Sequence, residues 1–131
     1  MKLVALSLST AIVSAAFTTF AMAKPINLSC AVERYAHAGF KHQGITESWF
    51  PKNTTHQLSD GKAVWKETGA GGTYTEGNGR IKISYVLKDT QGTEITVVYT
   101  YIRKTGIFTG KMGVMAGYAD TSGTTGRCTI K

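Results

Sequence analysis

A glycine-rich stretch, ETGAGGTYTEGNGR from Glu67 to Arg80, is the first candidate for chemistry, because glycine-rich loops hold phosphates in nucleotide enzymes. A Walker-type loop ends in Gly-Lys-Ser/Thr, and the stretch contains no such triplet. The dinucleotide fingerprint needs a third glycine where Tyr74 stands, and the Thr-Tyr-Thr run around it favours a strand over the required helix. The stretch therefore predicts turns on both sides of a short strand, and it does not predict nucleotide binding.

Three histidines, His37, His42 and His56, are the next candidate ligands. A zinc site needs three or four converging ligands. The five-residue spacing of His37 and His42 places them on opposite faces of a strand. We therefore expect histidines at the surface or in loops, and we expect neither a metal nor a cofactor.

Catalytic machinery is not evident in the sequence. It contains no Gly-x-Ser-x-Gly nucleophile elbow, and its acidic residues are scattered. Two carboxylates such as Glu47 and Glu67 would suit general acid–base work if they met across a barrel mouth, but nothing in their spacing indicates that they do. No catalytic residue is assigned.

Basic residues are concentrated in the second half of a chain with a formal net charge of +7. Alternation along a strand that begins at Arg80 places several of them on its outward face, and the next hairpin tip adds two more. This candidate basic face consists of Arg80, Lys82, Lys88, Arg103, Lys104 and Lys111. It fits an anionic envelope component or an acidic protein, or it only keeps the protein soluble.

Large aromatic residues fall on the inward-facing positions of the same strands and their neighbours. They form a candidate ligand-binding interior of Trp49, Trp65, Tyr85, Tyr99, Tyr101, Phe108 and Tyr118. Buried tyrosine hydroxyls need hydrogen-bond partners, and an eight-stranded barrel is wide enough either to be filled or to hold one small ligand. These residues therefore indicate either a packed core or a pocket for a small apolar or aromatic molecule.

The only two cysteines, Cys30 and Cys128, lie near opposite ends of the predicted domain. In an oxidising compartment they allow one intramolecular pairing, which would set the first and last parts of the domain side by side. The rival interpretations are an intermolecular bridge and a reactive thiol. We expect a structural disulfide.

Alternating apolar and polar residues predict strands through most of the domain. A meander of three strands, beginning at Arg80, Thr93 and Phe108, is the clearest element. Asp60-Gly61 predicts a two-residue hairpin turn, because glycine accepts positive φ. The segment ITESWFP predicts a strand ending at Pro51, TTGRCTIK predicts a closing strand, and NLSCAVERYAHAG fits a first strand or a short helix.

The strand count predicts an all-β domain, a small antiparallel barrel of about eight strands closed by one disulfide, with a β-sandwich as the alternative. Size and strand count resemble lipocalin-like and avidin-like barrels by analogy only. The lipocalin Gly-x-Trp motif is absent, because Glu47-Ser48 precedes Trp49.

Residues 1–23 have the pattern of a secretory signal peptide: a positive Lys2, an apolar run and the small-x-small site Ala21-Met22-Ala23. A membrane anchor is the alternative, but serines and threonines dilute the run. We expect a single domain at 24–131, exported to the periplasm or beyond the cell, without a transmembrane segment after cleavage and without a nucleic-acid partner.

Three functions are compatible with these observations. The first is a small exported, non-enzymatic binding protein that holds a small apolar or aromatic ligand in the barrel. The alternative is a protein–protein module, such as an inhibitor of a lytic enzyme or protease, acting through loops and the basic face. The third is an enzyme that uses scattered carboxylates or histidines.

Overall fold

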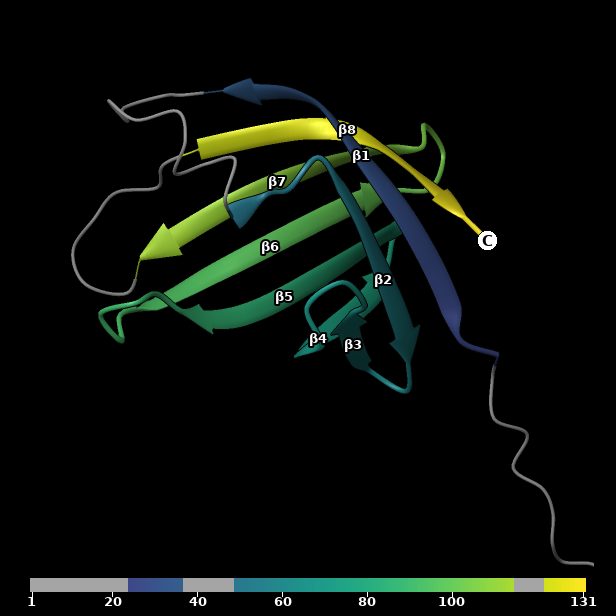
Figure 1. Cartoon of the computed structure of the whole chain (residues 1–131). Coiled ribbons are helices and arrows are strands. Elements are labelled where there is room, and N and C mark those ends of the chain that lie inside the picture. Colours follow the sequence, from purple (N-terminus) through teal and green to yellow (C-terminus); the bar gives the residue numbers. More distant parts are fainter. Residues whose placement is uncertain (1–23, 37–48, 115–121) are drawn as a thin grey trace, which may run out of the picture.

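The protein is a closed barrel of eight antiparallel strands, in which each strand pairs with its neighbours in sequence and the last pairs with the first (Figure 1). The computed structural model describes residues 24–36, 49–114 and 122–131. The strands are β1 (Ile26–Ala36), β2 (Asn53–Ser59), β3 (Lys62–Trp65), β4 (Ala70–Gly77), β5 (Arg80–Lys88), β6 (Glu94–Ile102), β7 (Ile107–Val114) and β8 (Ser122–Ile130). The predicted all-β barrel is confirmed, and the sandwich alternative is not adopted.

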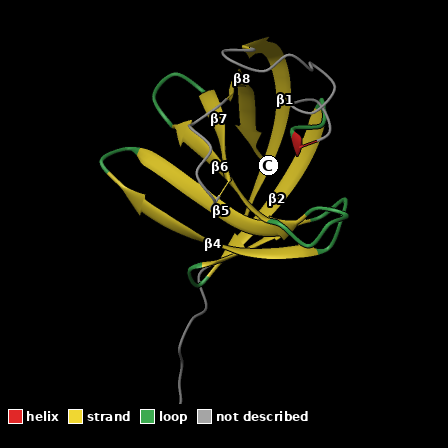
Figure 2. Cartoon of the chain, turned by 90° about the vertical axis from the view of Figure 1, so that its left-hand side faces the viewer, coloured by secondary structure: helices red, strands yellow, loops and turns green. Residues whose placement is uncertain are grey.

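The alternation of side chains along each strand decides what fills the barrel. On β6, buried residues alternate with half-buried ones, and the buried positions Ile95, Val97, Tyr99 and Tyr101 all face inward. β5 and β7 follow the same rule, and β6 pairs with both along its whole length without a register shift. The predicted meander of β5, β6 and β7 is confirmed (Figure 2). Its inward-facing side chains supply much of the hydrophobic core.

The disulfide joins the two strands that close the barrel. Cys30 on β1 lies directly opposite Cys128 on β8, and their sulfurs are bonded. Both residues are buried in the interior. The first strand, which the sequence left open between strand and helix, is β1. It carries a bulge between Val32 and Arg34 where its register with β8 shifts.

The two ends of the barrel differ in the length of their connections. The turns after β2 and β4 contain two residues each, and positive φ angles at Asp60 (51°), Gly61 (78°), Asn78 (54°) and Gly79 (73°) identify type I′ hairpins. The predicted Asp60-Gly61 turn is confirmed. The β1–β2 and β7–β8 connections, at the opposite end, are the longest.

The glycine-rich stretch is more regular than predicted. The strand within it, β4, extends over Ala70–Gly77 and so takes in Gly71 and Gly72, which we had expected in a turn. Both glycines pair with β3, and Gly72 also pairs with Tyr85 on β5. A Cβ on Gly72 would lie 2.6 Å from the Tyr85 ring, so the glycine makes room for that side chain.

The predicted strand through Trp49 is wrong in the part that the structure describes. Trp49 and Phe50 belong to no strand, and β2 begins only at Asn53. Phe50 instead enters the barrel and is fully buried, with its ring edge against Tyr99. Its carbonyl accepts a hydrogen bond from the Tyr35 hydroxyl at 2.7 Å. The absence of a side chain at Gly110 is what leaves space for the ring, because a Cβ there would lie 2.6 Å from it.

Candidate functional site

Five of the seven residues of the candidate ligand-binding interior lie inside the barrel, as predicted. They are no more than 6 % exposed: Trp65, Tyr85, Tyr99, Tyr101 and Phe108. Trp49 is the exception, because it is half-buried and packs against the core from outside the strands. Tyr118 lies outside the described residues. Aromatic rings thus meet one another in the interior, as Tyr99 and Phe108 do with centroids 5.5 Å apart.

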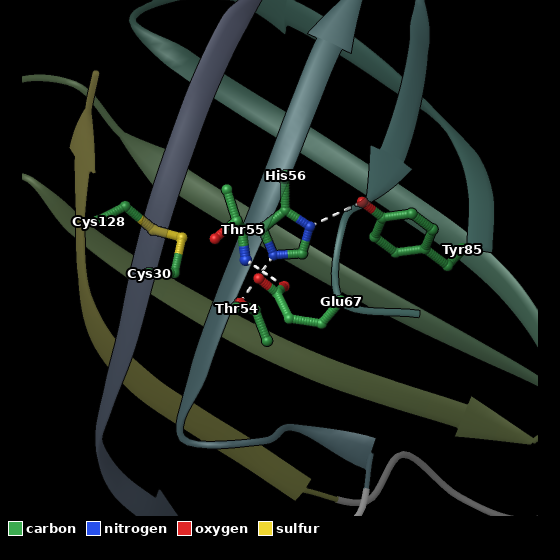
Figure 3. Close-up of a disulfide and its surroundings, with 7 residues drawn as sticks. All are labelled: Cys30, Thr54, Thr55, His56, Glu67, Tyr85 and Cys128. Atoms are coloured by element: carbon green, nitrogen blue, oxygen red, sulfur yellow. Dashed lines mark hydrogen bonds between the residues drawn. A yellow bond between two sulfur atoms is a disulfide. The ribbon is translucent and has the colours of Figure 1, made fainter. Parts of the chain in front are cut away.

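His56 occupies the centre of this aromatic cluster. It is fully buried, and its ring lies 4.5 Å from that of Tyr99 and 5.9 Å from that of Trp65, measured between centroids. Its Nδ1 shares a hydrogen bond of 2.7 Å with the Tyr85 hydroxyl, and its Nε2 shares one of 2.9 Å with Oγ1 of Thr54 (Figure 3). A neutral imidazole donates at one nitrogen and accepts at the other, so both ring nitrogens are satisfied.

The expectation of a surface or loop position is therefore wrong for His56. Inward-facing positions on β2 are those of Thr54, His56 and Leu58, all buried. Parity with Leu58 was the signal that could have placed the histidine inside, since side chains two apart on a strand face the same way. His37 and His42 lie outside the described residues.

Burial determines the protonation of these polar groups. Desolvation lowers the pKa of His56 to about 4, and the charge of Glu67 opposes the change only partly. Desolvation also raises the pKa of Tyr85 and of Tyr99 well above the ordinary value, with a smaller contribution in each case from Glu67. At neutral pH the imidazole of His56 is thus uncharged and the hydroxyls of Tyr85 and Tyr99 keep their protons.

Glu67 lies outside this cluster, at the exposed turn between β3 and β4. Its carboxylate accepts a hydrogen bond of 2.6 Å from the backbone N–H of Thr55 (Figure 3). Slight burial pushes its pKa upward, but the hydrogen bonds from Thr55 outweigh that effect and hold the pKa below its usual value. Glu47, the other carboxylate considered for acid–base work, lies outside the described residues.

Three buried polar atoms have no hydrogen-bond partner among the described residues: Nε1 of Trp65, the Tyr99 hydroxyl and Oγ1 of Thr124. The Thr54 hydroxyl lies close enough to that of Tyr99 to counteract part of the rise in its pKa, although the pair does not meet hydrogen-bond geometry. Buried polar atoms are usually paired, so these three are the least satisfied groups of the described interior.

All six residues of the predicted basic face are exposed, but they do not form one cluster. Arg80 and Lys82 point outward from the start of β5, and the β6–β7 turn brings Arg103 and Lys104 beside them, since the Arg103 N–H donates to the carbonyl of Gly79 at 2.9 Å. The other two members lie apart. Lys88 is at the far end of β5 opposite Glu94, and Lys111 is on β7.

The other four residues, Arg80, Lys82, Arg103 and Lys104, form a basic cluster, and only some of them have an acidic partner among the described residues. Arg103 forms a hydrogen-bonded ion pair with Glu76 of β4, whose Nε–Oε1 distance is 2.9 Å. Within the described part of the chain, no carboxylate lies within ion-pair distance of Arg80 or Lys82. Arg80 and Lys82 thus remain available to a partner.

Arg80 and Lys82 border a hollow on the outer surface with a volume of about 400 Å³. The residues that line it come from three strands and one turn, and most carry a polar or charged group: Thr75, Glu76, Gly77, Asn78, Arg80, Lys82 and Thr100. The sequence predicted the two cations but not the hollow, since the threonines and Gly77 become neighbours only through the β4–β5–β6 register. This hollow is the candidate binding site.

Other kinds of site find less support in the described residues. No group of three or more His, Cys, Asp or Glu among residues 24–36, 49–114 and 122–131 is placed to hold a metal ion. Over the same ranges, no helix has the length and apolar character needed to cross a membrane. No protein-family model, curated protein or solved structure matches the chain.

Proposed function

We propose that the protein is an exported, non-enzymatic binding protein that holds an anionic partner on the outer surface of β4, β5 and β6. The observation that carries this proposal is the adjacency of Arg80 and Lys82, two cations without a carboxylate partner among the described residues, at one polar hollow. Unneutralised charge in a concave surface attracts a partner of opposite sign.

The scaffold supports a binding role because it holds this surface rigidly. β5 is paired on both sides, with β4 and with β6, and the barrel has no free sheet edge. The outward-facing residues therefore keep a fixed spacing and lose little freedom when a partner binds.

Export is supported by the disulfide between Cys30 and Cys128, because such bonds form and persist in oxidising compartments. Together with the signal-like residues 1–23, it favours the periplasm or the extracellular space.

Charge reversal on the basic cluster is expected to weaken binding to an acidic polypeptide. Changing Arg80, Lys82 and Lys104 to glutamate should lower the affinity for immobilised polyglutamate by about tenfold, because like charges then face each other across the interface. The measurement is retention on a polyglutamate column as a function of salt concentration, which screens such contacts.

A variant of equal net charge provides the control. Lys52, Lys62 and Lys66 are also exposed and lie away from the hollow, so their change to glutamate alters the total charge by the same amount. This control should retain most of the binding. Equal losses in both variants would mean that only net charge matters, and would contradict the proposal.

A second candidate function, a small molecule held inside the barrel, is favoured by the three unpartnered polar atoms. In that case the Tyr99→Phe variant is expected to lose a co-purified molecule and about 1 kcal/mol of stability, because the hydroxyl would bond to that molecule. Mass spectrometry of the denatured protein and urea unfolding measure the two effects. Tyr101→Phe, at a tyrosine whose hydroxyl is not among the three, is the control. A gain in stability for Tyr99→Phe would contradict this candidate, since it would show an unsatisfied hydroxyl.

A further inference from the structure

We infer that the hollow beside β5 is a binding site for a phosphate monoester group, a specific subsite within the basic surface on which the proposed function rests. The ligand would be a dianionic tetrahedral oxyanion, either free or as the end group of a larger molecule. Register, charge balance and the shape of the hollow each support this inference.

The strand register surrounds Lys82 with hydroxyl groups. Lys82 pairs with Thr75 on β4 and with Thr100 on β6. Directly paired residues project to the same side of a sheet, so both threonines stand beside the ammonium on the outer surface. All three border the hollow. A phosphate oxygen can accept from the ammonium and from a hydroxyl at once.

Arg80 adds a second, differently shaped donor. It lies two residues from Lys82 on the same strand, so both side chains project from the same face. Its planar guanidinium can donate two parallel hydrogen bonds to one oxyanion, and Asn78 in the adjoining turn adds an amide. Two cations match a charge of about −2, which a phosphate monoester approaches at pH 7 and a single carboxylate does not.

Glu76, the acidic residue of the lining, does not cancel these charges. It is exposed near the end of β4, and its register partner on β5 is Ile81 rather than Arg80 or Lys82. Its carboxylate is held by Arg103 at the end of the barrel. The Glu76–Arg103 pair is thus charge-balanced, and the hollow retains the positive charges of Arg80 and Lys82.

Gly77 gives the hollow its depth next to Arg80. The two residues are cross-strand partners, and a Cβ on Gly77 would meet no atom within 4 Å. Its φ is not among the positive ones, so a β-branched residue is compatible with the strand. Gly77→Val therefore places a branched side chain beside Arg80 at the hollow while every charge stays in place, which separates a shaped site from diffuse attraction.

The test is a titration with inorganic phosphate at constant ionic strength, followed through backbone amide NMR signals. Phosphate should shift the amides of Thr75, Asn78, Lys82 and Thr100, whereas chloride should not. We expect Lys82→Ala to weaken phosphate binding by about tenfold, the loss typical of one charge-assisted hydrogen bond. Gly77→Val should weaken it by a similar factor, because the added side chain obstructs the approach of the ligand to Arg80. Lys111→Ala removes an equal charge outside the hollow and should change the affinity less than twofold.

Thr100→Val serves as the second variant if Gly77→Val does not fold, since it deletes a lining hydroxyl with little change of volume. Vesicles of phosphatidylcholine with and without phosphatidic acid identify the source of the group. If the protein co-sediments only with vesicles that contain phosphatidic acid, and the Gly77→Val variant (or Thr100→Val in its place) does not, the phosphate group belongs to a lipid. Phosphate binding without co-sedimentation indicates a soluble source.

The phosphate site would be overturned if Lys82→Ala and Lys111→Ala weakened phosphate binding equally while Gly77→Val, or Thr100→Val in its place, did not weaken it. The proposed function would then still stand on polyglutamate binding that depends on the basic cluster. Loss of that dependence would overturn the proposed function instead.

Discussion

Replacing Cys30 and Cys128 together with alanine is expected to lower the free energy of unfolding by about 4 to 5 kcal/mol. The disulfide spans 98 positions in sequence and links the two strands that close the barrel. Cutting it lets the unfolded chain explore far more conformations, and the gain in entropy grows with the length of the loop. This loss is a large share of the stability usual for a domain of this size.

Urea unfolding measures this effect, and the dependence on urea concentration adds a second signature. A less constrained unfolded state exposes more surface, so the slope of stability against urea should become steeper in the variant. Reduced wild-type protein is the control, because it has the same open chain with both thiols retained. A variant as stable as the oxidised wild type would contradict the expectation.

Lowering the pH from 6.5 to 4 is expected to remove about 3 kcal/mol of stability through His56 alone. The unfolded histidine binds a proton near pH 6.5, whereas the folded one resists it until about pH 4. Between these values the unfolded state binds more protons, so protons favour unfolding. The contribution of the neutral ring is thus complete above pH 6.5 and is lost as the pH falls towards 4.

The His56→Gln variant isolates this contribution, because glutamine does not titrate. All other ionisable residues are the same in both proteins, so the difference between the two curves reports on His56 together with its electrostatic coupling to Glu67. Stability measured by urea unfolding at several pH values should fall less steeply for the variant across this range. Parallel curves would mean that His56 takes up its proton without cost in the folded protein.

Strand alternation predicted the meander well because each inward position is apolar or aromatic and each outward one is mostly polar. The run from Arg80 to Lys88 is an example, with Ile81, Ile83 and Tyr85 buried and its three basic residues exposed. Over nine residues, such alternation leaves little doubt that the segment is a strand and which of its faces is buried. The disulfide could be predicted as well, because two cysteines allow only one intramolecular bridge.

The sequence could not predict how the connections pack. Phe50 lies outside the strands, and nothing local indicates that its ring would fill the space left by Gly110, sixty positions away. His56 was misplaced because Leu58 is the one apolar residue of β2, and a single apolar position is a weak sign of which face of a strand is buried.

The candidate site was predictable only in part. Charge and parity identified Arg80 and Lys82, but the ion pair that withdraws Arg103 links residues 27 positions apart. The threonines beside Lys82 come from two other strands, and their proximity depends on register. Whether these residues form a shaped hollow or only scattered surface charge depends on which strands lie side by side and in what register, and residue types alone do not determine that.

The bond between Cys30 and Cys128 turns the chain between them into a covalent ring. A protease that cuts once, for example at the exposed Asp60-Gly61 turn, opens that ring without releasing any part of it. All eight strands remain on one molecule, and the new ends stay next to each other because β2 and β3 are still paired. A nicked barrel therefore stays one covalent molecule as long as the disulfide is oxidised, and reduction of the disulfide is the second event needed to separate it into two fragments.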